Sequence, residues 1–207
     1  MPKIGKIAGL CACLLLSGCF MSAKPLITAR TADLPFADGS HFVEETNCAG
    51  PAQIVCGTDK GYHKTASSGT MHIEHGHYVM KSDPGSSFAA AAGAGGGNAD
   101  PAVMLKGVGG GLYIVQMDMG ADPRSRMPDT GRYLYELLDV KGKDAYVYSF
   151  TCEQNGDQHY VKAGELASVT SAMGMPICNA RDLSGLAAVF RERVAGGEQP
   201  SERMVFN

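Results

Sequence analysis

The sequence lacks several features that mark common functional classes. Its 207 residues include no tryptophan, only 7% are aromatic and 19% are charged, and the formal net charge is −3. Nucleic-acid-binding proteins need a cationic surface that neutralises phosphates, and no long run of Lys and Arg is present, so we expect no nucleic-acid partner. The motifs Gly-x-Ser-x-Gly, Ser-x-x-Lys and His-Glu-x-x-His, which mark several classes of hydrolase, are also missing. We therefore expect a protein that is not an enzyme.

An apolar run near the N-terminus is too short to cross a membrane. Lys3 and Lys6 precede an apolar stretch from Ile7 to Leu16, whereas a helix that spans a bilayer needs about 20 apolar residues. A basic start followed by a short apolar stretch is typical of a secretory signal peptide. The stretch ends in Leu16-Ser17-Gly18-Cys19, which resembles the lipobox of bacterial lipoproteins.

The lipobox resemblance implies that residues 1–18 are a signal peptide and that Cys19 becomes the acylated first residue of the mature chain. A membrane is then a partner, because each buried CH₂ of the acyl chains contributes about 0.8 kcal/mol. Phe20 stands where the inner-membrane retention signal of such lipoproteins has aspartate, which favours the outer membrane, facing the periplasm. The alternatives are an ordinary signal peptide that is cleaved elsewhere and an uncleaved anchor.

Four cysteines besides Cys19 follow the signal peptide: Cys48, Cys56, Cys152 and Cys178. An even number of cysteines in an exported chain indicates disulfide bonds, and four cysteines allow three pairings. Closing a short loop loses less chain entropy than closing a long one. We therefore expect the local pairing, which joins Cys48 to Cys56 and Cys152 to Cys178.

The residues after the signal peptide predict one domain on a tether. Residues 19–35 contain two prolines and little periodicity, so we expect a lipidated tether there and a single β-rich domain over residues 36–207. Turn glycines repeatedly precede aromatic residues in this domain, as in Gly76-His77-Tyr78. Such units predict a mainly β (α+β) fold, in which an antiparallel meander forms a barrel or a sandwich. The Gly/Ala-rich residues 89–100 predict a flexible loop.

Several elements can be predicted individually. Residues 133–152 predict a hairpin, and Tyr146, Tyr148, Phe150 and Cys152 share one face of its second strand, which we expect to point inward. Residues 102–106 and 112–119 predict another hairpin around a glycine cluster. One helix is expected, from Asp182 as N-cap to Gly196-Gly197, with Leu183, Leu186, Ala187, Phe190 and Val194 on its apolar side. The C-terminal segment ERMVFN predicts a final edge strand.

A cluster of histidines, His72-Ile-Glu-His-Gly-His-Tyr78, is the one candidate metal site. If His75-Gly76 form the two-residue loop of a hairpin, Met71, Ile73, Tyr78 and Met80 share one face of the strands. His72, Glu74 and His77 then share the other face, which we expect to be exposed. The three side chains are within reach of copper or zinc, but the sequence shows no second set of residues that would hold them in place.

Two functions fit these observations. The first is a lipid-anchored module of the cell envelope that binds an apolar ligand or a protein partner and uses no cofactor. The alternative is a metal-handling lipoprotein of the envelope that binds copper or zinc through His72, Glu74 and His77.

Overall fold

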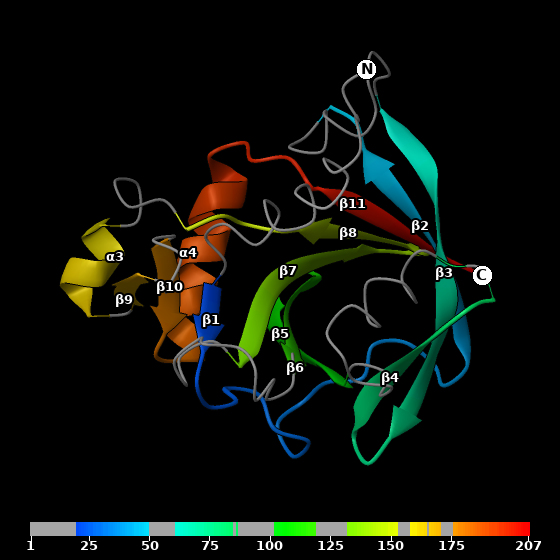
Figure 1. Ribbon diagram of the computed structural model, residues 1–207, viewed down its shortest axis with the longest axis horizontal. Coiled ribbons are helices and arrows are strands. Elements are labelled where there is room, and N and C mark those ends of the chain that lie inside the picture. Colours follow the sequence, from blue (N-terminus) through cyan, green and yellow to red (C-terminus); the bar gives the residue numbers. More distant parts are fainter. Residues whose placement is uncertain are drawn as a thin grey trace, which may run out of the picture.

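The computed structural model describes residues 20–49, 61–84, 86, 102–118, 132–152, 158–164, 166–170 and 176–207. These residues form mostly β-structure (Figure 1). The strands are β1 (Phe20–Ser22), β2 (Ser40–Asn47), β3 (Tyr62–Glu74), β4 (His77–Ser82), β5 (Ala102–Gly109), β6 (Leu112–Asp118), β7 (Tyr133–Lys141), β8 (Asp144–Tyr148), β9 (Leu166–Thr170), β10 (Pro176–Ala180) and β11 (Glu202–Phe206). The helices are α3 (Gln158–Ala163) and α4 (Leu183–Ala195). Within the described residues, neither helix has the length and hydropathy needed to span a membrane.

Eight of the strands close into an antiparallel barrel. Their order is β6-β5-β4-β3-β2-β11-β8-β7, and a further pairing of β6 with β7 closes the ring. The predicted β class is therefore confirmed, and the choice between a barrel and a sandwich is resolved in favour of the barrel. Closure leaves none of these eight strands as a free edge, which removes the backbone groups through which open sheets aggregate.

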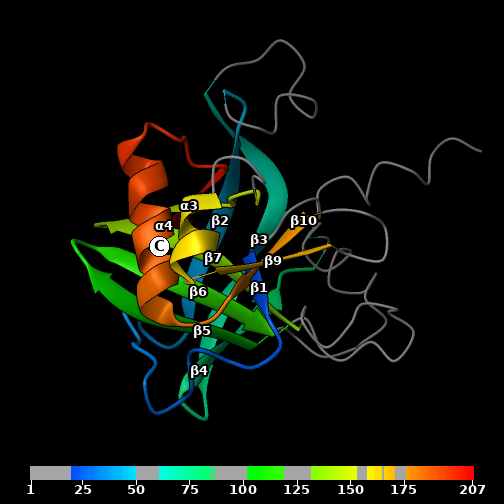
Figure 2. The same cartoon turned by 90° about the vertical axis from the view of Figure 1, so that its left-hand side faces the viewer.

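The three remaining strands extend the barrel wall into a second layer. β1 pairs antiparallel with the start of β7 and parallel with β10, and β9 pairs antiparallel with β10. α4 lies across the outside of the barrel beside these strands (Figure 2). The disulfide between Cys152 and Cys178 joins the segment after β8 to β10, so it links the barrel to the second layer.

Strand alternation divides the buried side chains between two cores. Odd-numbered residues of β7, such as Tyr135 and Leu137, face the core that lies between the barrel wall and α4. Leu138 faces the barrel interior, with Phe42 and Phe206. Because successive side chains of a strand point to opposite faces, β7 is buried on both sides, which explains its long apolar run.

The three predicted hairpins are present with the predicted turns. In β3 and β4, Met71 pairs with Met80 and Ile73 with Tyr78, which is the predicted register. His75 has a φ of 51° and Gly76 a φ of 83°, as a two-residue turn with two left-handed residues requires. β5–β6 and β7–β8 are the other two hairpins.

The predicted helix is also confirmed. The carboxylate of Asp182 accepts a 2.8 Å hydrogen bond from the backbone N–H of Gly185, which satisfies one of the free donors at the start of α4. The helix ends at Gly196 and Gly197. Phe190 is fully buried, and its ring meets that of Phe20 at 5.2 Å in an edge-on arrangement.

Three expectations need correction. The C-terminal strand is not an edge strand: β11 lies between β2 and β8 and completes the barrel. The buried face of β8 that carries Tyr148 points away from the barrel interior, toward the core under α4, whereas Ala145 and Val147 point into the barrel. The described part of residues 19–35 is not a free tether, because β1 is buried in the sheet and Ile27 is fully buried.

Candidate functional site

The histidine hairpin has the predicted faces. Tyr78 and Met71 are buried inside the barrel, and His72, Glu74 and His77 lie on its outer face. Nδ1 of His72 lies 3.5 Å from the carboxylate of Asp38, and the Glu74 carboxylate lies 3.8 Å from Nζ of Lys81. Among the described residues, no group of three or more His, Cys, Asp or Glu side chains is arranged to hold a metal ion.

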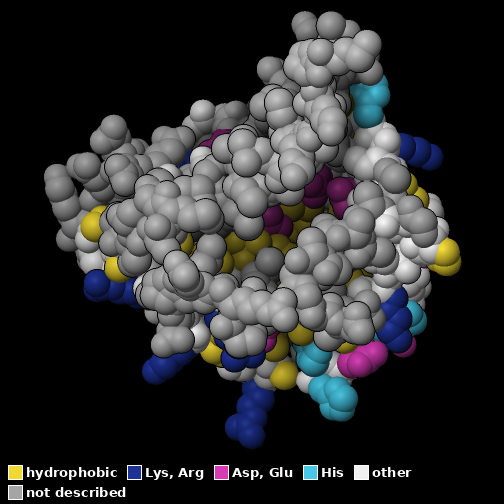
Figure 3. All heavy atoms as spheres, viewed as in Figure 1, with side chains coloured by type: hydrophobic (Ala, Val, Ile, Leu, Met, Phe, Trp, Pro, Cys, Tyr) yellow, Lys and Arg dark blue, Asp and Glu magenta, His cyan; other side chains and the backbone are white. Residues whose placement is uncertain are grey.

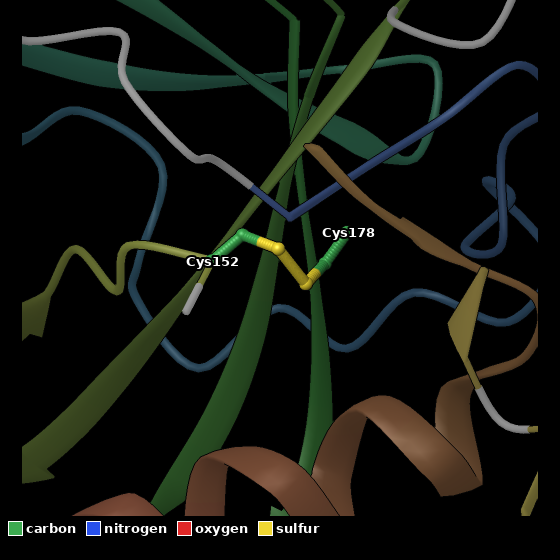
Figure 4. The surroundings of a disulfide bond; sticks show 2 residues. All are labelled: Cys152 and Cys178. Carbon is green, nitrogen blue, oxygen red and sulfur yellow. A yellow bond between two sulfur atoms is a disulfide. The ribbon is translucent and has the colours of Figure 1, made fainter. Parts of the chain in front are cut away.

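The predicted link between Cys152 and Cys178 is present. Their sulfur atoms are 2.04 Å apart and their Cα atoms 5.5 Å apart (Figure 4). Both side chains are buried in the core under α4, so the disulfide has a structural position. Cys48 is also disulfide-bonded, whereas Cys56, its expected partner, and Cys19, the expected lipidation site, lie outside the described residues.

The barrel interior is apolar and closed at one end. Phe36 covers this end: its ring stacks on that of Phe206 with 4.2 Å between the centroids. The Tyr78 hydroxyl fixes the Phe36 backbone by accepting a hydrogen bond from its N–H and donating one to its carbonyl, each of 2.8 Å. We call this the closed end of the barrel.

Three carboxylates face the interior farther from the closed end. Glu44 lies two residues from Phe42 on β2, Glu136 two residues from Leu138 on β7, and Glu202 four residues from Phe206 on β11. Alternation therefore places each of them on the interior face of its strand. We call Glu44, Glu136 and Glu202 the carboxylate cluster, and the end of the barrel that holds it the carboxylate end.

Strand pairing brings the members of the cluster together. Met204 of β11 pairs with Glu44, and Glu202 pairs with Thr46, so the two glutamates are diagonal neighbours on one face. On the other side of β11, Glu202 pairs with Val147 of β8. Ser149, which follows β8, donates a 2.6 Å hydrogen bond to the carboxylate of Glu136.

The electrostatics of the cluster agree with this geometry. The pKa of Glu44 is raised to about 7, first by burial and then by the carboxylates of Glu202 and Glu136, while a hydrogen bond from Ser67 lowers it. Burial also raises the pKa of Glu136 to about 7, against the opposing effect of the Ser149 hydrogen bond. Burial raises the pKa of Glu202. The cluster is therefore partly protonated near neutral pH.

The three side chains of the carboxylate cluster are partly exposed. Burial is nevertheless the largest cause of the raised pKa of each carboxyl group. Figure 3 shows a hollow in the surface, with hydrophobic side chains at its floor and acidic side chains at its wall.

The carboxylate cluster was not predicted from the sequence. Adjacent acidic residues such as Glu44 and Glu45 point to opposite faces of a strand, and the structure agrees: Glu45 faces outward and pairs with Arg203. The missed signal is a glutamate on the same strand face as apolar residues, which occurs at Glu136 and Glu202 as well. A carboxylate on an otherwise apolar strand face is costly to bury without a partner, so it indicates a polar partner or access to water at that position.

The segment after β1 is fixed to the outside of the barrel by a buried amide. The side-chain oxygen of Gln116, which is 1% exposed, accepts 2.8 Å hydrogen bonds from the N–H groups of Leu26 and Ile27. Its amide nitrogen donates a 2.9 Å hydrogen bond to the carbonyl of Ile27. These contacts hold residues 26 and 27 against β6.

Comparisons with protein-family models, with curated proteins and with solved structures find no match to this chain.

Proposed function

We propose that this protein is a lipid-anchored binding module of the cell envelope and that its barrel interior holds an apolar ligand. The lipobox resemblance at Leu16-Ser17-Gly18-Cys19 supports the anchor. One observation supports the ligand site: the barrel interior is apolar and closed at one end and carries the carboxylate cluster farther along, and Figure 3 shows a hollow with a hydrophobic floor and acidic side chains at its wall. Small-molecule sites are typically concave and apolar, with a few placed polar groups. The proposal includes no catalytic step.

The carboxylate cluster would fix the orientation of the ligand in the barrel. An apolar group at the floor, beside Phe42 and Phe206, loses its contact with water and is favoured by about 25 cal/mol per Å². At the other end, Glu44, Glu136 and Glu202 accept hydrogen bonds and favour a positive charge. We therefore propose an amphiphile with an apolar body and an amine or another hydrogen-bond donor at its head.

Calorimetry with matched amphiphiles tests the ligand. The mature chain carrying Cys19→Ser can be purified without detergent and titrated with decylamine, decanol and decanoate below their micelle concentrations. We expect decylamine to bind most tightly and decanoate least, and we expect Glu136→Gln to reduce the preference for the amine. Saturable binding by none of the three probes would remove the proposal.

The anchor has its own test. Mass spectrometry of the mature protein from native membranes should find acyl groups on Cys19, and Cys19→Ser should lose both the acyl mass and the membrane fractionation. A Cys19→Ser variant that still fractionates with the membrane and is processed at the same bond would contradict the lipid anchor.

A further inference from the structure

The fold leaves almost no linker between the expected lipidation site and the folded domain. β1 begins at Phe20, the residue that follows Cys19, and Phe20 is fully buried. Phe20 pairs on one side with Tyr135 and on the other with Cys178. Consecutive Cα atoms are 3.8 Å apart, so an acyl group on Cys19 is attached within one residue of a strand that is paired on both sides.

Strand pairing also fixes where this attachment point lies on the barrel. Phe20 is opposite Tyr135. Because β1 and β7 are antiparallel, a step back from Phe20 to Cys19 corresponds to a step forward on β7 from Tyr135 to Glu136. Glu136 belongs to the carboxylate cluster and is hydrogen-bonded to Ser149. Continuing this pairing by one residue puts the attachment point level with Glu136 of the carboxylate cluster, three residues along β7 from Tyr133 and five from Lys141.

The residues after β1 prevent the domain from swinging about this point. The hydroxyls of Ser22 and Tyr135 are hydrogen-bonded at 2.8 Å, and Ser22 is buried. Farther along, Gln116 binds the backbone of Leu26 and Ile27. A flexible linker would let the domain adopt any orientation, whereas here the first residues of the mature chain are part of the sheet.

We infer that the carboxylate end of the barrel faces the phospholipid bilayer and that the closed end points away from it. This inference rests on the proposed lipid anchor. The turn between β7 and β8 marks the far side: Lys141 lies five residues beyond Glu136, about 17 Å along the strand at about 3.4 Å per residue. The hollow then opens toward the membrane, so its ligand is an amphiphile that passes between the bilayer and the barrel without crossing water.

Within the part of the chain that the structure describes, two other charged or titratable side chains at the carboxylate end have the interior orientation of their strands: His63 and Arg132. Both are exposed, and the Arg132 guanidinium makes two hydrogen bonds to the Asp118 carboxylate, of 3.0 and 2.7 Å. The Arg132 guanidinium thus stands at the same end as the carboxylates, and the end that meets the lipid head groups carries charges of both signs.

Photocrosslinking from the two ends of β8 tests the orientation. Ser149 follows β8 at the carboxylate end, Lys143 precedes it at the far end, and both are exposed. Each is replaced in turn by p-benzoylphenylalanine in the lipidated full-length protein, and native membranes are irradiated. We expect several-fold more phospholipid adducts from position 149 than from position 143. Equal adducts, or more from position 143, would overturn the inference.

Two controls separate this inference from the proposed anchor. If Cys19→Ser leaves membrane association and crosslinking unchanged, the anchor itself is wrong; if the acyl groups are present but the adducts show no preference, only the orientation is wrong. A flexible Gly/Ser insertion of about ten residues between Cys19 and Phe20 extends the reach of the anchor by more than 15 Å. It should keep the protein on the membrane and abolish the difference between positions 149 and 143.

Exposed Thr151 serves as a second crosslinking position if the change at Ser149 prevents folding.

Discussion

The hydroxyl of Ser149 donates a 2.6 Å hydrogen bond to the carboxylate of Glu136. The bond joins a residue just after β8 to an inward-facing residue of β7, where β8 leaves the barrel wall and β1 takes its place beside β7. This hydrogen bond lowers the pKa of the Glu136 carboxyl group, but burial outweighs it and raises that pKa to about 7. The balance between these effects makes the stability of the barrel sensitive to pH.

We expect the stability of the protein to fall as pH rises from about 4.5 to about 7. The pKa of Glu136 is raised from 4.5 to about 7 by burial, so the folded state binds its proton more tightly than the unfolded state. The contribution of the protonated Glu136 side chain to the free energy of unfolding is complete below pH 4.5 and is lost as pH rises through about 7. After allowance for solvent screening, the loss is about 1 to 2 kcal/mol, or roughly 2 to 8 °C in the melting temperature.

The Glu136→Gln variant should show a flatter dependence of the melting temperature on pH and a higher melting temperature than the native protein at pH 8. Glu74→Gln is the matched control, because it removes the same charge from an exposed position on the hairpin. A pH profile that is equally steep in Glu136→Gln and in the native protein would show that this carboxyl group is not responsible.

Replacing Cys152 and Cys178 together by alanine should destabilise the protein by about 3.5 kcal/mol, as the chain-entropy model gives for a loop of this length. The disulfide closes a separation of 26 residues and links the barrel to β10. Urea unfolding of the oxidised mature chain and of the double variant measures the difference. Equal unfolding midpoints with equal slopes would contradict this prediction.

Gln116→Leu should destabilise the protein by about 1 to 3 kcal/mol, because it removes the acceptor of the buried Ile27 N–H and the donor to the Ile27 carbonyl. The N–H of Leu26 also loses a bond to Gln116 but keeps the Tyr135 hydroxyl as an acceptor at 3.2 Å. Limited trypsin digestion should then cut faster after Arg30, which lies three residues beyond Ile27. Gln199→Leu is the control, since Gln199 is exposed and bonds only to a nearby carbonyl; equal cleavage rates in the two variants would count against the role of Gln116.

Titration of the mature chain with copper and zinc tests the metal alternative. We expect no saturable micromolar site at the hairpin, because no three ligand side chains of the described residues are arranged around one point and Glu74 lies beside Lys81. Calorimetry measures the binding directly. Micromolar binding that disappears in the His72→Ala/His77→Ala variant would instead establish a metal-handling function.

Local signals allowed much of the fold to be predicted. The His75-Gly76 turn fixed the register of β3 and β4, since a slip by one residue would move Tyr78 from the interior to the outer face. Asp182 and Gly196 marked the ends of α4, because capping preferences depend only on residues next to the helix end. The pairing of Cys152 with Cys178 followed from chain entropy alone.

The carboxylate cluster depends on closure of the barrel, which local signals do not contain. Glu44 and Glu202 are neighbours only because β11 inserts between β2 and β8. The same insertion turned an expected edge strand into a wall strand. The place of β1 escaped prediction for a similar reason: three residues carry no periodicity, and only the partners β7 and β10 define the strand.

β1 also constrains the order in which the protein assembles. It is the first described strand of the chain, yet the hydrogen bond between Ser22 and Tyr135 spans 113 residues, and β10 lies still farther along. Contacts between such distant segments form late and slowly. In the proposed lipoprotein, the segment that forms β1 follows the signal peptide directly, so cleavage of the signal peptide and completion of the second layer would be linked. Under that proposal the protease-resistant state should appear after cleavage, and a precursor that keeps the signal peptide should lack the pairing of β1 with β7 and β10.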